Sequence, residues 1–227
     1  KMKSGGFDAA FFIVYVGQTA RTPENYAAAR ADALTKFAAI RRMAETYPDR
    51  IAIAYTADDV QRIVASGKLV AAIGVENGFS AGTDLAALDE FHALGARYFG
   101  LVHNGDNDLA QSAQPRAELG DGPAESAGVT EIGARAIARL NELGVMVDVS
   151  HASKRSALDA IRLSRAPVIA SHSSVRALTD HPRNMDDETL RALRDDGGVV
   201  QIVAFESYLK TQPPERQEAV RALRERF

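Results

Sequence analysis

The chain has 227 residues, 46% hydrophobic and 25% charged, which is enough to bury a core and is typical of a globular protein. Its net charge of -3 gives no overall attraction to nucleic acid or to an anionic membrane. There is no Cys, which excludes disulfides and thiolate metal sites, so a metal site would have to use histidines and carboxylates. No apolar run approaches the roughly 20 residues that span a bilayer, and the N-terminus has no signal-peptide pattern.

Apolar runs and amphipathic segments alternate along the chain. The apolar runs predict strands at 7–16, 51–56, 69–76, 97–103, 145–151, 167–172 and 199–205. The amphipathic segments predict helices at 22–47, 57–67, 84–95, 130–144, 153–164 and 186–198. The first of them would have Thr22 as its N-cap and Pro23 at its first helical position. A polar loop covers about 104–128, and no low-complexity linker interrupts the series. We therefore expect one domain over residues 1–227.

Alternating strands and helices predict parallel pairing, which fits either a doubly wound sheet or a (β/α)8 TIM barrel. Glu76, His103, His151 and His172 each stand at the end of a different predicted strand. In a barrel these ends converge on one face, where active sites lie, so we favour the barrel. Without the shorter candidate at 51–56 we count six main strands, so a complete barrel would need about two more, one before the first residue and one after the last.

Two imidazoles and a carboxylate form a typical set of ligands for a divalent cation, Zn²⁺ above all. His151 and His172 end adjacent strands, so both rings can reach one ion, and Glu76 can reach it too or bridge two ions. A single histidine at a strand end is more often structural, but three of the five histidines fall at such ends. Of the others, His92 lies in a predicted helix and His181 in a loop.

Other polar residues near these strand ends permit two interpretations. Arg183 could bind a substrate carboxylate with two hydrogen bonds, or could be a surface residue of its loop. Asp148, inside the strand 145–151, could hold a histidine ring or could be a polar residue of the barrel interior. The run "HNGDND" at 103–108 indicates mainly a turn.

At these residues the chain resembles the membrane dipeptidase (renal dipeptidase) family, the M19 metallopeptidases. The combination of "VDVSH" with "VIASHSS" and "HPRN" is much more specific than a lone pair of histidines. The matching stretches follow the family order: "AAIGVENG", "ARYFGLVHNGDNDLAQSA", "LNELGVMVDVSHAS", "APVIASHSSVRALTDHPRN" and "DGGVVQIVAF".

The resemblance implies a metal-dependent hydrolase barrel with two zinc ions, which cleaves dipeptides through a hydroxide that bridges the metals. Glu76 would match the carboxylate that bridges the two zincs, and His151 and His172 would match the imidazole ligands of one of them. His103 would match the catalytic histidine that contacts the substrate carbonyl and stabilises the tetrahedral intermediate.

The resemblance also implies residues that bind substrate. Arg183 would match the residue that binds the terminal carboxylate of the dipeptide, and Tyr208 falls, more loosely, where the family has a tyrosine on the substrate side. The family ligates its other zinc with a His-x-Asp motif in its first strand, and nothing before Phe7 matches that motif. The family's proton-accepting aspartate, in its last strand, would lie beyond Phe227. We therefore expect either the middle part of a dipeptidase or a shortened relative.

Two alternatives stay open. One is another barrel hydrolase, acting on a lactone, cyclic amide or phosphoester, which would keep Glu76, His151 and His172 but have no use for Arg183. The other is a non-catalytic relative that binds metal. As partners we expect a dipeptide substrate and no nucleic acid, and exposed sheet edges would favour a homodimer.

Overall fold

The computed structural model describes residues 2–211 and 213–226, and its centre is a curled parallel sheet. Six strands follow one another in sequence order across the sheet, β1-β3-β4-β5-β6-β8. The short strand β2 pairs with β3, and the short strand β7 pairs with β6. The strands are β1 (Ala9–Tyr15), β2 (Ile51–Ile53), β3 (Leu69–Glu76), β4 (Ala96–Gly100), β5 (Met146–Asp148), β6 (Ile169–Val175), β7 (Asn184–Met185) and β8 (Val199–Ile202).

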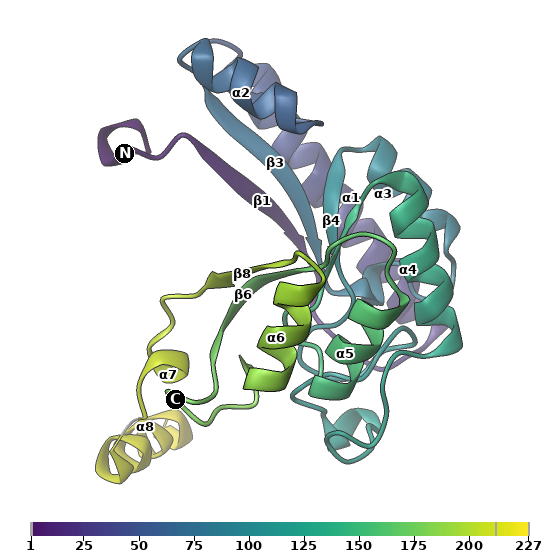
Figure 1. Ribbon diagram of the computed structural model, residues 1–227, viewed down its shortest axis with the longest axis vertical. Coiled ribbons are helices and arrows are strands. Elements are labelled where there is room, and N and C mark those ends of the chain that lie inside the picture. The colour runs from purple at the N-terminus through teal and green to yellow at the C-terminus, as the bar shows by residue number, and fades with distance from the viewer. Residues whose placement is uncertain (1, 212, 227) are drawn as a thin grey trace.

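The helices that connect the strands lie along the convex side of the sheet, and the last two helices follow β8 at the end of its arm (Figure 1). They are α1 (Pro23–Thr46), α2 (Ala57–Ala65), α3 (Ala86–Ala93), α4 (Glu131–Leu143), α5 (Lys154–Leu163), α6 (Asp187–Asp195), α7 (Glu206–Leu209) and α8 (Pro214–Arg226). Short 3-10 helices occur at η1 (Lys3–Gly5), η2 (Gly78–Ser80) and η3 (Ala117–Leu119). The described residues contain no helix that is both long enough and apolar enough to cross a membrane.

Side chains of the capping type fix where the helices begin. Thr22 accepts a hydrogen bond from the backbone N–H of Asn25 and is followed by Pro23, as the sequence predicted. Thr130, Ser153 and Asp186 cap α4, α5 and α6 in the same way, each through the backbone N–H three residues on. These caps fix the residue at which each loop ends and the following helix begins.

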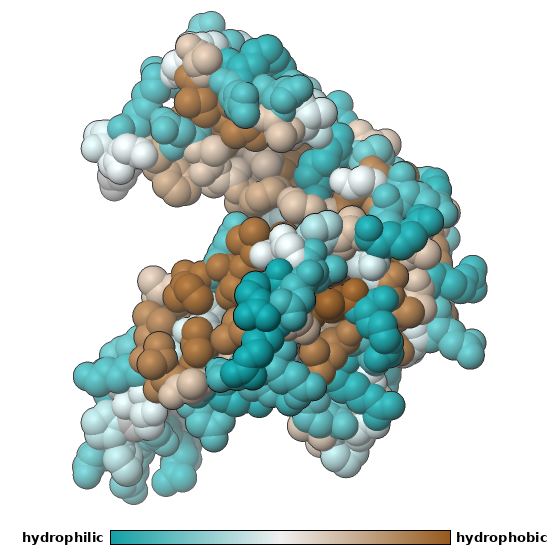
Figure 2. Space-filling view, in the orientation of Figure 1, coloured by the Kyte–Doolittle hydropathy of each residue, from teal (hydrophilic) through white to brown (hydrophobic). Residues whose placement is uncertain are grey.

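Successive parallel strands with helices outside them define part of a (β/α)8 barrel, which is the predicted fold class. The sheet curls, and between its two ends lies a hollow of about 780 Å³ that opens to solvent (Figure 2). The arm with β1 and β3 forms one wall of this hollow, and the arm with β6 and β8 forms the other.

The alternation of side chains along β3 separates the core from the hollow. Ile73 and Val75 point to the helices and are fully buried in the core, while Ala72 lines the hollow. Because neighbouring residues of a strand point to opposite faces, Glu76 at the end of β3 lies on the hollow side with Ala72. The core therefore fixes the face on which this carboxylate lies.

Several strand boundaries differ from the prediction, and three of these differences change where a histidine of the site lies. β4 ends at Gly100 and β5 at Asp148, so His103 and His151 lie in the loops that follow, three residues past each strand. His172 lies within β6, which continues to Val175. The apolar runs predicted the strands but not these ends, because the first residues of the loops are as apolar and as buried as the strands themselves.

Gly133, in the first turn of α4, packs directly against the carbonyl of Leu109, where an added Cβ would lie 1.9 Å from the oxygen. Helix propensity alone predicts that Gly133→Ala stabilises the chain by about 1 kcal/mol. We expect instead a loss of about 1–3 kcal/mol, because backbone atoms cannot yield to the new methyl group. Urea denaturation measures the difference, with the exposed Ala138→Gly in the same helix as the control. A Gly133→Ala protein that is more stable than the wild type would contradict the close approach.

Candidate metal centre

Glu76 is the last residue of β3 and pairs in register with Tyr15 of β1. Its side chain is 17% exposed and lines the hollow. The next residue, Asn77, is fully buried with φ +80°, and its side-chain oxygen accepts the backbone N–H of Phe79. This turn ends the strand directly behind the carboxylate and carries the chain away to the helix side.

His151 follows β5 in a tight turn with φ +69°, a conformation that few residues other than Gly adopt. The backbone N–H of Ala113 donates to the His151 carbonyl at 2.7 Å, which ties this turn to the long loop after β4. The same loop provides Asn104, whose Oδ1 lies 2.9 Å from Nδ1 of His151. The ring is thus held at one nitrogen, and its other nitrogen points to Glu76.

His172 in β6 is held from the opposite side. Its Nδ1 lies 2.8 Å from the hydroxyl of Ser171, and that hydroxyl donates to Oδ2 of Asp148 at 2.6 Å. The other carboxylate oxygen, Oδ1, accepts the backbone N–H groups of Ser150 and Ser171, each at 2.9 Å. Asp148 is 1% exposed, so this small network is sealed from solvent.

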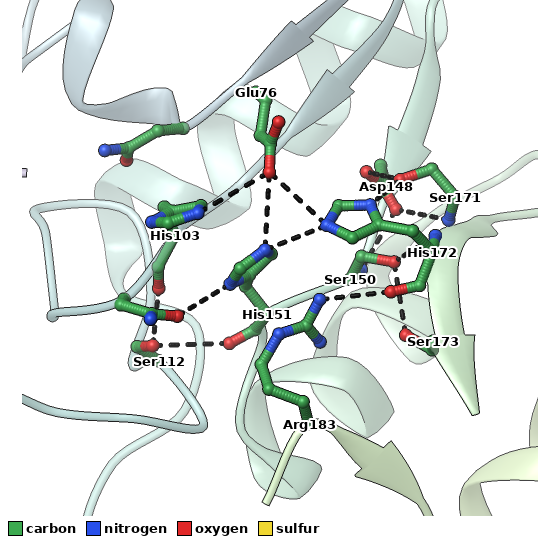
Figure 3. A network of polar contacts seen from close by, with 12 residues as sticks. Glu76, His103, Ser112, Asp148, Ser150, His151, Ser171, His172, Ser173 and Arg183 are labelled. Atoms are coloured by element: carbon green, nitrogen blue, oxygen red, sulfur yellow. Dashed lines mark hydrogen bonds and ion pairs between the residues drawn. The ribbon is translucent and has the colours of Figure 1, made fainter. Parts of the chain in front are cut away.

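The free nitrogens of these rings converge on one oxygen of Glu76 (Figure 3). The Nε2 atoms of His151 and His172 each lie 3.3 Å from Oε1 of Glu76 and 2.9 Å from each other. Nε2 of His103 lies 3.6 Å from the same oxygen. The three predicted metal ligands and the predicted catalytic histidine are therefore brought together at one point.

Burial shifts the pKa values of two of these groups. It lowers the pKa of His151 to about 3 and also lowers that of His103. These two rings are therefore neutral at pH 7, the form in which an imidazole binds a cation.

Arg183 lies beside the cluster and is 3% exposed. One terminal N–H group donates to the carbonyl of His172 at 3.1 Å, while its buried Nε has no hydrogen-bond partner among the described residues. Its guanidinium carbon lies 5.5 Å from the ring centroid of Tyr208, which belongs to α7. The structure thus places both predicted substrate-binding residues next to each other, on the β6 side of the cluster.

Two residues at the site were not predicted from the sequence. Asn104 stands in the run that indicated a turn, and Ser171 stands inside an apolar strand. Neither residue type signals a role, because serine and asparagine are common in such places. Asn104 reaches the ring of His151 only through the packing of two loops, and Ser171 is joined to Asp148 only through the pairing of β5 with β6. Of the remaining histidines, His92 lies in α3 and His181 in a loop, as predicted.

The donor set fits a divalent metal ion. The carboxylate oxygen of Glu76 and the imidazole nitrogens of His151 and His172 suit Zn²⁺ in type, and three protein ligands are the usual number at a catalytic zinc site. The ligand atoms of Glu76, His103 and His151 lie within 4.8 Å of one another, and the distances among Glu76, His151 and His172 are shorter still.

A partial (β/α)8 barrel with a histidine and carboxylate cluster beyond its strands defines a class of metal-binding barrel proteins. Within that class, residues 1–224 match the model of the membrane dipeptidase family, peptidase family M19. The chain therefore belongs to this family.

Relatives of the chain carry consistent names. It is 34% identical over 220 residues to dipeptidase tcpJ of Claviceps purpurea (strain 20.1), which covers 95% of the chain and 50% of that protein. The fold is similar to that of the probable dipeptidase PvdM from Pseudomonas aeruginosa, with a TM-score of 0.92 and 33% identity over 100% of this chain and 57% of that one. A metallopeptidase from Rhodobacter sphaeroides, solved with a phosphinate mimic of L-Ala-D-Ala, gives a TM-score of 0.81 and 27% identity over 99% and 70%. The chain spans about half the length of the curated relatives it matches.

The low pKa of His151 predicts how the stability of the metal-free chain depends on pH. The unfolded histidine takes up a proton below about pH 6.5, whereas the folded one stays neutral down to about pH 3, so acid favours unfolding in this window. We expect the free energy of unfolding to fall by up to about 2 kcal/mol between pH 6.5 and 5 because of this residue. Urea denaturation with a chelator present measures it. The variant His151→Asn, which tolerates a positive φ, should show a shallower dependence, and an equal slope in both proteins would contradict the assignment.

Proposed function

We propose that this chain contributes the catalytic site of a zinc-dependent dipeptidase. The observation that carries the proposal is the convergence of His151 and His172 on one oxygen of Glu76, beside a buried arginine that has an unused donor. Membership of the M19 family supports the same reaction. A bound Zn²⁺ lowers the pKa of its water to about 7 and so supplies a nucleophile at neutral pH.

We assign Glu76, His151 and His172 as ligands of one zinc, with Glu76 positioned to bridge to a second. The position of Glu76 supports this role, because its carboxylate lines the open hollow and also faces the two rings. The remaining ligands of a second zinc are not among the described residues of the cluster.

His103 is assigned to the substrate carbonyl. It lies at the rim of the cluster, with its ring packed against His151 at a centroid distance of 4.0 Å and against Tyr15 at 4.8 Å. Because burial lowers its pKa, the ring is neutral at pH 7 and can donate one N–H group to the oxygen that gains charge during attack. The contacts with both rings fix its orientation before substrate arrives.

Arg183 is assigned to the free carboxylate of the dipeptide. A buried guanidinium with an unpartnered Nε is costly unless a ligand completes its hydrogen bonds, and a carboxylate matches its planar donors. Tyr208 packs against the guanidinium and would form the wall next to that carboxylate. A site that requires a terminal carboxylate close to the scissile bond selects very short peptides.

The test of the function is the hydrolysis of a dipeptide panel by the purified protein with zinc restored. We expect turnover that a chelator abolishes and zinc restores, and a preference for dipeptides over the matching dipeptide amides, which lack the carboxylate. If no dipeptide is cut, the proposed function is wrong. Turnover of lactones, cyclic amides or phosphoesters in place of dipeptides would establish the alternative hydrolase.

Replacing Arg183 tests the carboxylate contact. We expect Arg183→Ala to raise KM for a dipeptide by at least about 30-fold, because loss of one partner of a buried charge pair costs about 2–5 kcal/mol. Arg183→Lys, which keeps the charge but loses the planar donors, should have an intermediate effect. The matched control is the dipeptide amide, whose KM should change little in either variant. An unchanged KM for the free dipeptide would exclude this role for Arg183.

A further inference from the structure

Asn104 and Ser171 contact Nδ1 of the two proposed ligand histidines, His151 and His172. These contacts determine which nitrogen of each ring carries the proton. We propose that Asp148, acting through Ser171, is a positioning residue that keeps the proton of His172 on Nδ1 and so leaves Nε2 free to bind the metal ion. The inference rests on the proposed metal site, and it adds two residues that act on a ligand without touching the ion themselves.

His151 provides the simpler case. Its Nδ1 lies 2.9 Å from the side-chain oxygen of Asn104, and an amide oxygen can only accept a hydrogen bond. The proton of the neutral ring must therefore be on Nδ1. The lone pair of Nε2 then points to Oε1 of Glu76, 3.3 Å away.

His172 has a hydroxyl in the same position, and a hydroxyl can donate or accept. Whether the Ser171 hydroxyl donates to the ring or accepts from it depends on its second hydrogen bond, which is with Asp148. Oδ1 of Asp148 is filled by the backbone N–H groups of Ser150 and Ser171, which leaves Oδ2 to accept the proton of the Ser171 hydroxyl at 2.6 Å. Burial raises the pKa of Asp148, and the three donors directed at its carboxylate oppose that shift by favouring the ionised form.

Once the Ser171 hydroxyl has donated its only proton to Asp148, it can only accept from the ring of His172. The neutral ring is then protonated on Nδ1, as in His151, and its Nε2 lone pair faces the cluster. Glu76 Oε1 and the two Nε2 atoms therefore place three lone pairs within 2.9–3.3 Å of one another. Three acceptors at this separation repel each other unless a cation or a shared proton lies between them.

A purely structural role for Asp148 is the competing explanation, since its Oδ1 also ties β5 to β6 through the two backbone N–H groups. The two roles predict different results for Asp148→Asn. An asparagine can keep both backbone contacts through its oxygen, but its NH2 group would then donate to Ser171. The Ser171 hydroxyl would turn to donate to Nδ1 of His172, and the ring proton would move to Nε2, as happens when an amide replaces the carboxylate behind a catalytic histidine.

The experiment measures the tautomer and zinc affinity in the same proteins. Long-range ¹H–¹⁵N spectra of the metal-free, ¹⁵N-histidine-labelled chain at about pH 8 report which nitrogen of His172 is protonated, and competition with a chelating dye gives the affinity for Zn²⁺. The variants are Asp148→Asn, Ser171→Ala and Ser171→Thr, which keeps the hydroxyl. The control is Ser173→Ala, which removes a buried hydroxyl of the same strand that contacts Ser150 and neither ring. Thermal unfolding confirms that each variant is folded.

We expect the wild-type ring to be protonated on Nδ1 and the Asp148→Asn ring on Nε2. Zinc affinity should fall by about 10- to 100-fold in Asp148→Asn and Ser171→Ala and stay close to the wild type in Ser171→Thr and Ser173→Ala. A wild-type ring protonated on Nε2, or unchanged affinity in both Asp148→Asn and Ser171→Ala, would overturn the inference alone. A folded wild-type chain that binds no zinc would overturn the metal site itself and this inference with it.

Discussion

The site depends on one electrostatic constraint, the crowding of acceptor atoms around a single point. An oxygen of Glu76 and the Nε2 atoms of His151 and His172 come from three different strand units and lie 2.9–3.3 Å apart. In a partly buried setting such groups repel one another, and a protein would not keep them together without a positive charge among them. A divalent cation supplies that charge, and the supporting residues are those that hold the acceptors in place.

Each acceptor is held by a different feature of the sheet. The strand register and the apolar residues of β3 fix the face of Glu76, a turn with positive φ directs His151, and the Asp148 network orients His172 from behind. Buried polar groups are concentrated around this point, where each hydrogen bond is worth more than it is in water. Arg183 lies beside the cluster, and this position fits its proposed role of binding the substrate carboxylate next to a metal ion.

Much of this could be predicted from the sequence, because the signals are local. The apolar runs predicted the strands of the partial barrel, the capping residue Thr22 marked the start of α1, and polar residues after apolar strands marked Glu76 and His151. The exact strand ends could not be predicted, because the loops after β4 and β5 are as buried as the strands. Asn104 and Ser171 were missed for a different reason. Their roles come from contacts between segments far apart in the chain, Asn104 with His151 and Ser171 with Asp148, which no local pattern records.

The most direct test of the account is the position of a bound metal ion. Crystals of the protein grown with zinc, measured at the zinc absorption edge, show the ion as an anomalous peak. The account predicts a peak about 2.0–2.2 Å from Oε1 of Glu76 and from the Nε2 atoms of His151 and His172, the usual distances for zinc with these ligands. A zinc-loaded crystal with no peak among these three atoms, or with zinc bound through Nδ1 of either ring, would contradict it.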